Sequence, residues 1–306
     1  MSKPILLTHP DCLHHEMAKH AERPDRLRAV LEHFDSTGLS GDMQMDLASE
    51  ITEGDIEKVH PRDYIEHVGS SEPASGTIML DPDTYMSPGS YRASKLAAGA
   101  AVEATQRVLS GETNRAFCAT RPPGHHAELA SALGFCMFNN VALAAETALL
   151  NPNIDKIAIF DFDVHHCNGT VDIFKDRPEV LVCSSFQNHF YPHRYLDYST
   201  DHIIATPLDS GCDSLTFRNS IERDWLKAIE AHTPDLVLIS AGFDAHELDP
   251  LAEVNLQADD YRWITELLVS YANTYSQGRI VSTMEGGYNL ESLSLSAAEH
   301  IKVLIA

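Results

Sequence analysis

The sequence has no apolar run long enough to cross a membrane. No stretch approaches the roughly 18 consecutive apolar residues of a spanning helix, and residues 1–7 are too short for a signal peptide. The six cysteines form no C-x-x-C pair and are scattered over the chain. These absences predict a cytoplasmic protein with reduced thiols and no association with membranes.

Basic residues are scarce, with 22 Lys and Arg against 45 Asp and Glu and a formal net charge of −23. Such a surface excludes general binding to nucleic acid, because it would repel the phosphates. The same field attracts cationic substrates such as lysine side chains or polyamines. An equally good interpretation is that the acidity serves solubility or a saline habitat.

No internal repeat, low-complexity block or linker divides the 306 residues. Apolar runs typical of buried strands alternate with segments of helical periodicity, which predicts a parallel sheet covered by helices. The histidines at 14, 15 and 20 are predicted to lie on the surface, and residues 69–87 are predicted to be a long loop. Strands are expected at residues 4–8, 115–120, 157–160, 180–185, 203–206, 236–240 and 279–284. Helices are expected at 22–33, 52–59, 61–68, 88–111, 140–150, 213–231, 257–275 and from about 290.

The strand at 157–160 runs directly into two aspartates and two histidines. Asp163 and His165 are two residues apart, so on an extended backbone their side chains point the same way, roughly 6–7 Å apart. A carboxylate and an imidazole that converge in this way bind divalent cations of borderline hardness. A solvated turn that caps the next helix is the alternative interpretation.

Three further polar clusters, residues 121–126, 241–246 and 285–289, each follow a predicted strand. The carboxyl ends of parallel strands meet at one edge of a sheet, so the four clusters predict one shared site. Asp163, His165 and Asp244 would bind a metal with one open position, which is typical of catalytic zinc. The His125-His126 pair offers a general base, and Tyr288 offers a hydroxyl to a developing oxyanion.

Asp161 and Asn168 would orient the two histidines of that pair. Together these groups predict metal-assisted hydrolysis of an amide.

Five motifs resemble the signatures of histone deacetylases, in the order of that family. They are R-P-P-G-H-H at 121–126, G-F-C-x-F-N-N at 134–140, D-F-D-V-H-H-x-N-G-T at 161–170, S-A-G-F-D-A at 240–245 and E-G-G-Y at 285–288. The resemblance is to the zinc-dependent arginase/deacetylase superfamily and its class II-like branch, from about residue 22 onward. It implies one α/β catalytic domain over residues 1–306, with an eight-stranded parallel sheet, helices on both faces and a narrow tube leading to zinc.

The resemblance also implies a role for each site residue. Asp163, His165 and Asp244 would be the zinc ligands. His126 would transfer the proton, with His125 as its electrostatic partner. The remaining implied roles are a carbonyl-polarising hydroxyl at Tyr288, a tube wall at Phe135, a backbone contact to substrate at Gly134, a rim at Leu251, and a structural potassium site around Asp161, Asp163, His165 and Ser184.

The chain departs from the family pattern at two positions. Cys167 stands where the family usually has glycine; its thiol would either fill a small pocket or make activity sensitive to oxidation. Phe186 stands where a histidine is common, which leaves open whether Phe190 or Tyr191 walls the tube.

The predicted function is removal of acetyl or related acyl groups from lysine side chains by metal-activated water, with Zn²⁺ or Fe²⁺ as the metal. The alternative is deacetylation of acetylpolyamines or other small amides. Polyamine-selective relatives have glutamate after the proline of the rim segment, whereas this chain has Leu251, which favours the apolar stem of an acyl-lysine.

Two other functions fit less well. A binuclear manganese hydrolase would need an additional acid after each of the ligand segments, where this chain has Cys167 and His246. A non-catalytic protein that only binds acetyl-lysine would be expected to lack Tyr288, which this chain retains.

Overall fold

A computed structural model of the protein describes residues 3–17 and 19–306. Over these residues eight parallel strands form one sheet, in the order β2-β1-β5-β10-β9-β6-β7-β8. The predicted α/β fold with an eight-stranded parallel sheet is confirmed. The strands are β1 Ile5–Thr8, β2 Gln44–Leu47, β5 Arg115–Cys118, β6 Ile157–Asp161, β7 Val180–Gln187, β8 Ile203–Leu208, β9 Leu236–Ala241 and β10 Ile280–Met284.

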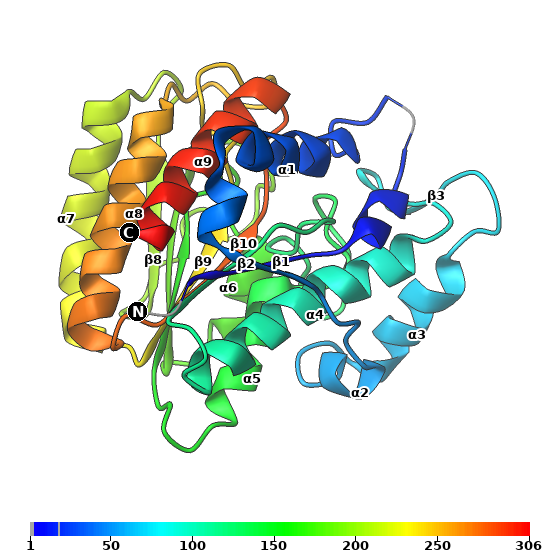
Figure 1. Ribbon diagram of the computed structural model, residues 1–306, viewed down its shortest axis with the longest axis horizontal. Coiled ribbons are helices and arrows are strands. Elements are labelled where there is room, and N and C mark those ends of the chain that lie inside the picture. Colours follow the sequence, from blue (N-terminus) through cyan, green and yellow to red (C-terminus); the bar gives the residue numbers. More distant parts are fainter. Residues whose placement is uncertain (1–2, 18) are drawn as a thin grey trace.

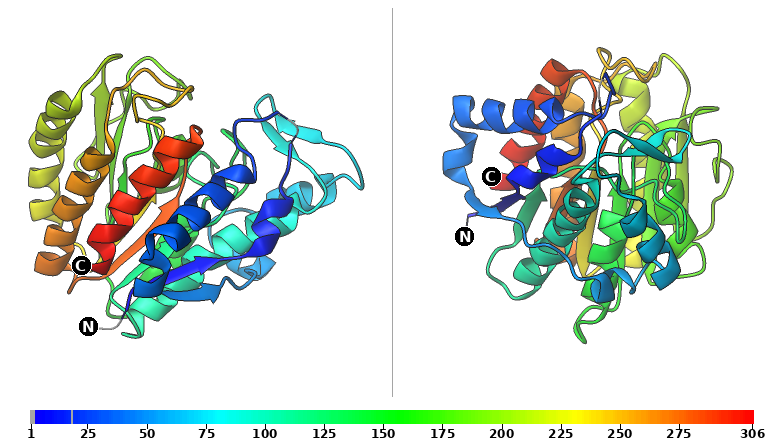
Figure 2. Two further views of the ribbon diagram at one scale, coloured as in Figure 1. Left: turned by 45° about the horizontal axis from the view of Figure 1, so that its top comes forward. Right: turned by 90° about the vertical axis from the view of Figure 1, so that its right-hand side faces the viewer.

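Helices cover both faces of the sheet, as predicted (Figures 1 and 2). One face carries α1 (Asp25–Thr37), α7 (Ser214–His232), α8 (Ala258–Tyr275) and α9 (Leu290–Ile305), which lie in a row in the left view of Figure 2. The other face carries α2 (Glu53–Ile56), α3 (Arg62–Ser71), α4 (Ser90–Leu109), α5 (Asn140–Leu149) and α6 (Asn168–Phe174). Short 3₁₀ turns cover Pro10–His14 and Leu39–Asp42.

The central strands are apolar throughout because both of their faces are buried. In β6 alternate side chains enter two different cores: Ala158 and Phe160 pack under α7–α9, whereas Ile157 and Ile159 pack under α4–α6. The strands β5, β10, β9 and β6 are consecutive neighbours in the sheet. Their carboxyl ends therefore bring the four polar clusters to one place.

The segment 69–87 was predicted to be a loop, and this prediction was wrong. It contains an antiparallel hairpin of β3 (Ile78–Asp81) and β4 (Thr84–Met86). Each strand is only three or four residues long, and neither face is fully buried, so the apolar signal was too short to separate from a loop. The hairpin matters because its turn reaches the site.

The N-terminal region differs from the prediction in two further respects. His15 was predicted to lie on the surface, but it is fully buried, with Nδ1 2.7 Å from the Ser90 hydroxyl and Nε2 3.4 Å from Glu22. The strand β2 was not predicted, because this edge strand is largely exposed and lacks a buried apolar run.

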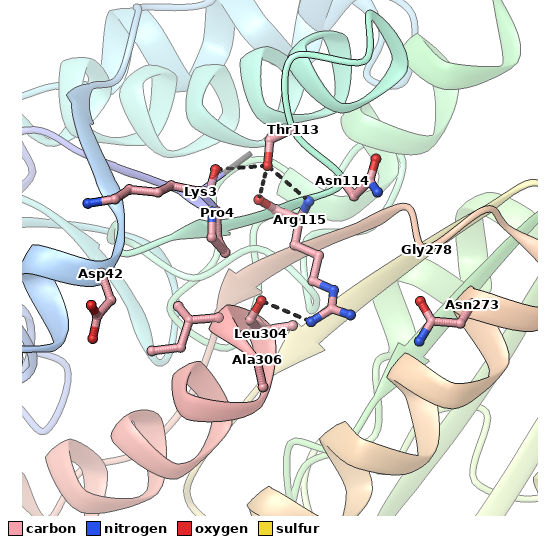
Figure 3. Close-up of a pocket in the computed structure, with 11 residues that line it drawn as sticks. Lys3, Pro4, Asp42, Thr113, Asn114, Arg115, Asn273, Gly278, Leu304 and Ala306 are labelled. Carbon is pink, nitrogen blue, oxygen red and sulfur yellow. Dashed lines mark hydrogen bonds between the residues drawn. The ribbon is translucent and has the colours of Figure 1, made fainter. Parts of the chain in front are cut away.

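Within the described residues no helix is both long and apolar enough to cross a membrane. A pocket of about 210 Å³ opens at the amino-terminal edge of the sheet, between Lys3, Arg115 and the end of α9 (Figure 3). The Arg115 guanidinium donates to the carbonyls of Val303 and Leu304 and closes off that helix end. Because the clusters of carboxylates and imidazoles lie at the opposite edge, we place the candidate site there.

Candidate active site

Three buried side chains converge where β6 and β9 end. Donor atoms of Asp163, His165 and Asp244 all lie within 4.8 Å of one another, and this is the single such group found over residues 3–17 and 19–306. His165 Nδ1 is 3.0 Å from Asp163 Oδ1 and 3.2 Å from Asp244 Oδ2. The structure thus brings together the three predicted metal ligands.

Two backbone positions next to these ligands, Gly242 and Gly286, have no room for a side chain. A Cβ on Gly242 would lie 2.1 Å from Asp163 Oδ2, and one on Gly286 would lie 2.0 Å from Asp244 Oδ2. Over the described part of the chain, Asp244 Oδ2 is buried and makes no hydrogen bond. Two carboxylates and an imidazole with an unsatisfied buried oxygen fit a divalent cation of borderline hardness such as Zn²⁺.

The predicted histidine pair lies next to these ligands, after β5. His125 Nδ1 is 2.9 Å from Asp161 Oδ2, and His126 Nδ1 is 2.6 Å from Asn168 Oδ1. The two imidazole rings are 4.0 Å apart between centroids, and the His126 ring lies 5.9 Å from that of His165. Asp161 therefore lies beside His125, and Asn168 lies beside His126.

The surroundings separate the pKa values of the two histidines. Burial alone would lower the pKa of His125, but the carboxylates of Asp161 and Asp163 outweigh burial and raise it to about 10. Burial, followed by the positive charges of His125 and His165, holds the pKa of His126 well below its ordinary value. His126 is therefore the neutral imidazole of the pair, which is the state a general base requires.

Tyr288 follows β10 and faces the same pocket. Burial and the nearby Asp244 and Asp163 keep its pKa well above the ordinary value despite Arg26, so the phenol retains its proton and is a hydrogen-bond donor. The Arg26 guanidinium lies 4.9 Å from the centre of the Tyr288 ring and donates to the carbonyls of Glu285 and Gly287. Arg26 thereby fixes the turn that presents the tyrosine.

A pocket of about 210 Å³ leads from the surface to these groups. It is lined by Asp83, His126, Gly134, Phe135, His165, Phe190, Tyr191, Leu251 and Tyr288. The predicted wall residue Phe135 and rim residue Leu251 both lie on it. Phe190 and Tyr191 also both line it. The sequence left open which of the two residues forms the wall, and in the structure both do.

Gly134 also lies on the pocket wall, with φ of 53°. A Cβ at this position would come within 2.2 Å of His126 Cδ2, so only glycine fits. Its N–H donates to Asp83, and the N–H of Phe135 donates to Thr84, both on the β3–β4 hairpin. The carbonyl of Gly134 accepts from the Cys136 thiol at 3.2 Å and keeps a second lone pair that can accept from a substrate.

The predicted potassium site receives no support from these contacts. The Ser184 hydroxyl is 2.9 Å from His166 Nδ1, and both oxygens of Asp161 are engaged, by His125 and by the N–H of Asp163. Cys167 is fully buried in the core under α4–α6, and burial raises the pKa of its thiol well above the ordinary value. The thiol therefore fills space and is a poor target for oxidation.

Sequence reasoning missed several residues that shape the site. Arg26 and Asp83 come from the N-terminal third of the chain. Asp249 accepts the N–H groups of Leu251, Tyr288 and Asn289, and so ties the rim to the tyrosine turn. The sequence places Asp249 in the rim segment, but nothing in the sequence indicates which N–H groups its carboxylate accepts.

Comparison with known proteins gives consistent relatives. The sequence model of the histone deacetylase domain family matches residues 20–304 of this chain. A histone deacetylase-like amidohydrolase of Pseudomonas aeruginosa is 35% identical over 279 residues, covering 89% of this chain and 73% of the relative. Histone deacetylase 14, chloroplastic, of Arabidopsis thaliana is 33% identical, covering 96% and 74%. The crystal structure of the HDA15 HD domain superimposes with a TM-score of 0.93 at 32% identity, covering 100% of this chain and 90% of that one.

Proposed function

This chain belongs to the histone deacetylase family, and from that premise we propose that it is a zinc-dependent deacetylase of acyl-lysine side chains. The observation that carries the proposal is the convergence of three ligands, two histidines and a tyrosine, of which His126, His165 and Tyr288 line one largely aromatic pocket. Such a pocket suits the methylene stem of a lysine and places its amide beside the polar groups.

In the proposed reaction Asp163, His165 and Asp244 hold the metal. Zn²⁺ held by these three side chains would act as a Lewis acid toward the amide carbonyl and would make water more acidic. His126, kept neutral by its surroundings, accepts the proton of the attacking water and later returns it to the leaving amine. His125, held as an imidazolium by Asp161, adds positive charge near the developing oxyanion.

Tyr288 donates its hydroxyl proton in a hydrogen bond to the same oxyanion. Phe135, Phe190 and Tyr191 surround the acyl-lysine stem and exclude water from the reacting amide. Leu251 provides an apolar rim with no charge for a second ammonium group of the substrate.

A second candidate is deacetylation of acetylpolyamines. Asp83 places a carboxylate on the pocket wall, and the net charge of −23 attracts polycations. The discriminating experiment measures kcat/KM of the zinc-loaded protein on acetyl-lysine peptides, N8-acetylspermidine and longer acyl-lysine peptides. A preference of tenfold or more for the polyamine, about 1.4 kcal/mol, would replace acyl-lysine with the second candidate.

The metal assignment has its own test. We expect one equivalent of zinc per chain in the wild type, and loss of both metal and turnover in Asp244→Ala. Two equivalents in the wild type, or full occupancy in Asp244→Ala, would contradict the proposed site.

A further inference from the structure

Glu128 links His126, through Asn168, to the segment that carries Phe190 and Tyr191 of the pocket wall. Its side chain is only 10% exposed. The Asn168 amide donates from Nδ2 to Glu128 Oε1 at 2.8 Å, while its Oδ1 lies 2.6 Å from His126 Nδ1. The other carboxylate oxygen, Oε2, accepts from the Arg194 guanidinium at 2.5 Å.

We propose that Glu128 is a positioning residue whose carboxylate fixes the orientation of the Asn168 amide, and through it the tautomer of His126. The inference rests on the proposed function, because it concerns how the general base of that reaction is kept in its working form.

The reasoning starts from what each group can donate. An ionised carboxylate only accepts hydrogen bonds, so the NH₂ of Asn168 must face Glu128 and its carbonyl oxygen must face His126. A carbonyl oxygen at 2.6 Å requires a proton on His126 Nδ1. The neutral ring then has its lone pair on Nε2, the nitrogen not engaged by Asn168.

The opposite orientation of the amide would disable the base. With NH₂ toward His126, Nδ1 would have to accept, and the ring proton would move to Nε2. Asp161, the partner of His125, cannot present a donor in this way, because both of its carboxylate oxygens only accept hydrogen bonds. One other hydrogen bond restrains the Asn168 NH₂ in the described structure, a longer contact of 3.3 Å to the carbonyl of His126.

The same carboxylate holds the segment between β7 and β8, which carries Phe190 and Tyr191. Arg194 belongs to this segment, and its neighbour Tyr195 donates to Asp172 at 2.8 Å. Asp172 also accepts the N–H of Leu129, next to Glu128, at 3.1 Å. Glu128 therefore joins the general base to the aromatic wall of the pocket.

Glu128→Gln provides a sharp test, because it keeps the shape and removes the acceptor-only character. Arg194 would attract the amide oxygen of the new side chain and turn its NH₂ toward the NH₂ of Asn168. Asn168 is then expected to rotate and reverse the tautomer of His126. In Glu128→Gln/Arg194→Ala the glutamine oxygen is free to face Asn168 again.

We expect kcat of zinc-loaded Glu128→Gln to fall about tenfold or more, since a general base contributes ~10²–10⁴ in rate. KM should change less than kcat. The double variant should regain much of the loss, and Arg194→Ala alone should act mainly on KM. Glu146→Gln is the matched control, because Glu146 is 16% exposed and pairs with Arg177 at 2.9 Å, away from the site.

The second readout is the tautomer of His126, measured by ¹⁵N NMR of histidine-labelled protein and assigned by the signals lost in His126→Ala. Wild-type kcat together with a wild-type tautomer in Glu128→Gln would overturn the proposal, as would a double variant no more active than Glu128→Gln. If the wild type hydrolyses none of the amides but the tautomer still reverses, the proposed function fails and the positioning role stands.

Discussion

At the scale of single residues, the same side-chain type takes different protonation states according to its partner. The carboxylates of Asp161 and Asp163 raise the pKa of His125 to about 10, whereas burial and the neighbouring positive charges hold the pKa of His126 well below its ordinary value. In the proposed reaction the adjacent pair would divide one electrostatic and one proton-transfer task between its members.

Tyr288→Phe removes one hydroxyl and leaves the aromatic ring and its contact with Arg26. We expect the variant to bind zinc normally but to lose about 10²–10³ in kcat, because a single oxyanion donor typically contributes that much. The measurement is kcat on an acetyl-lysine peptide, alongside metal content. Near wild-type turnover would mean that the hydroxyl only faces water.

Leu251→Glu tests the rim. The new carboxylate would pair with a secondary ammonium, so kcat/KM for N8-acetylspermidine should rise relative to an acetyl-lysine peptide. Glu253→Leu removes an existing acid of the same segment, whose carboxylate accepts from Ser210, and serves as the comparison. An unchanged substrate ratio in Leu251→Glu would show that this position does not select the substrate.

Individual site residues were predictable where they belonged to a dense motif after a strand. Asp163, His165 and Asp244 follow apolar runs, so their convergence followed from the periodicity of the chain. Glu128 and Asp249 lie in similar loops, but their importance depends on side-chain directions that the sequence does not specify. His15 was misjudged because a polar sequence neighbourhood hid its burial against Ser90.

At the scale of elements, short turns after the strands set the distances within the site. The turn after β10 is the tightest example. Gly286 donates its N–H to Asp163 at 2.8 Å, and its Cα lies against both carboxylate ligands. The β3–β4 hairpin acts in the same way from outside the sheet, because Asp83 and Thr84 bind the backbone of Gly134 and Phe135.

Gly286→Ala should weaken metal binding without unfolding the protein. The new methyl group would lie 2.0 Å from Asp244 Oδ2, so the ligand must shift. We expect zinc affinity to fall ~10–100-fold, as is typical when the support of a ligand is disturbed. Competition with a chelator measures the change, and Gly41→Ala, where a Cβ would meet nothing within 4 Å, is the control. Equal zinc affinity in both variants would contradict the role given to this turn.

Strands that bury more apolar surface were easier to predict from the sequence. The sequence indicated β6 and β9 because both are apolar on every face. It missed β2, whose side chains are largely exposed, and the β3–β4 hairpin, whose strands are too short to show a period.

At the scale of the whole molecule, two separate cores enclose several histidines that must stay neutral. His60 accepts the N–H of Asn139 at Nε2, and its Nδ1 is 3.0 Å from the carbonyl of Leu129. His300 lies between the hydroxyls of Thr265 and Ser282. Burial lowers the pKa of His60 to about 4 and that of His300 to about 3.

These shifts predict a loss of stability in mild acid. In the unfolded chain each histidine takes up a proton below about pH 6.5, whereas the folded protein cannot do so until the pH reaches the lowered pKa. The unfolded state then binds more protons, so the free energy of unfolding decreases by about 1.4 kcal/mol for each unit by which the pH falls, for each such histidine. The full contribution is present above pH 6.5 and is lost progressively down to about pH 4 for His60 and about pH 3 for His300.

Urea unfolding at pH 7, 6 and 5 measures this dependence. His300→Gln, which replaces one buried histidine with a side chain that does not titrate, should be less stable than the wild type at pH 7 but lose less of its stability on acidification. His67→Gln, at an exposed position on α3, should follow the wild type throughout. Because each variant is compared with the wild type at every pH, the carboxylates they share cancel, and the difference reports the buried imidazole alone. Parallel pH curves for His300→Gln and the wild type would mean that His300 already titrates normally in the folded protein.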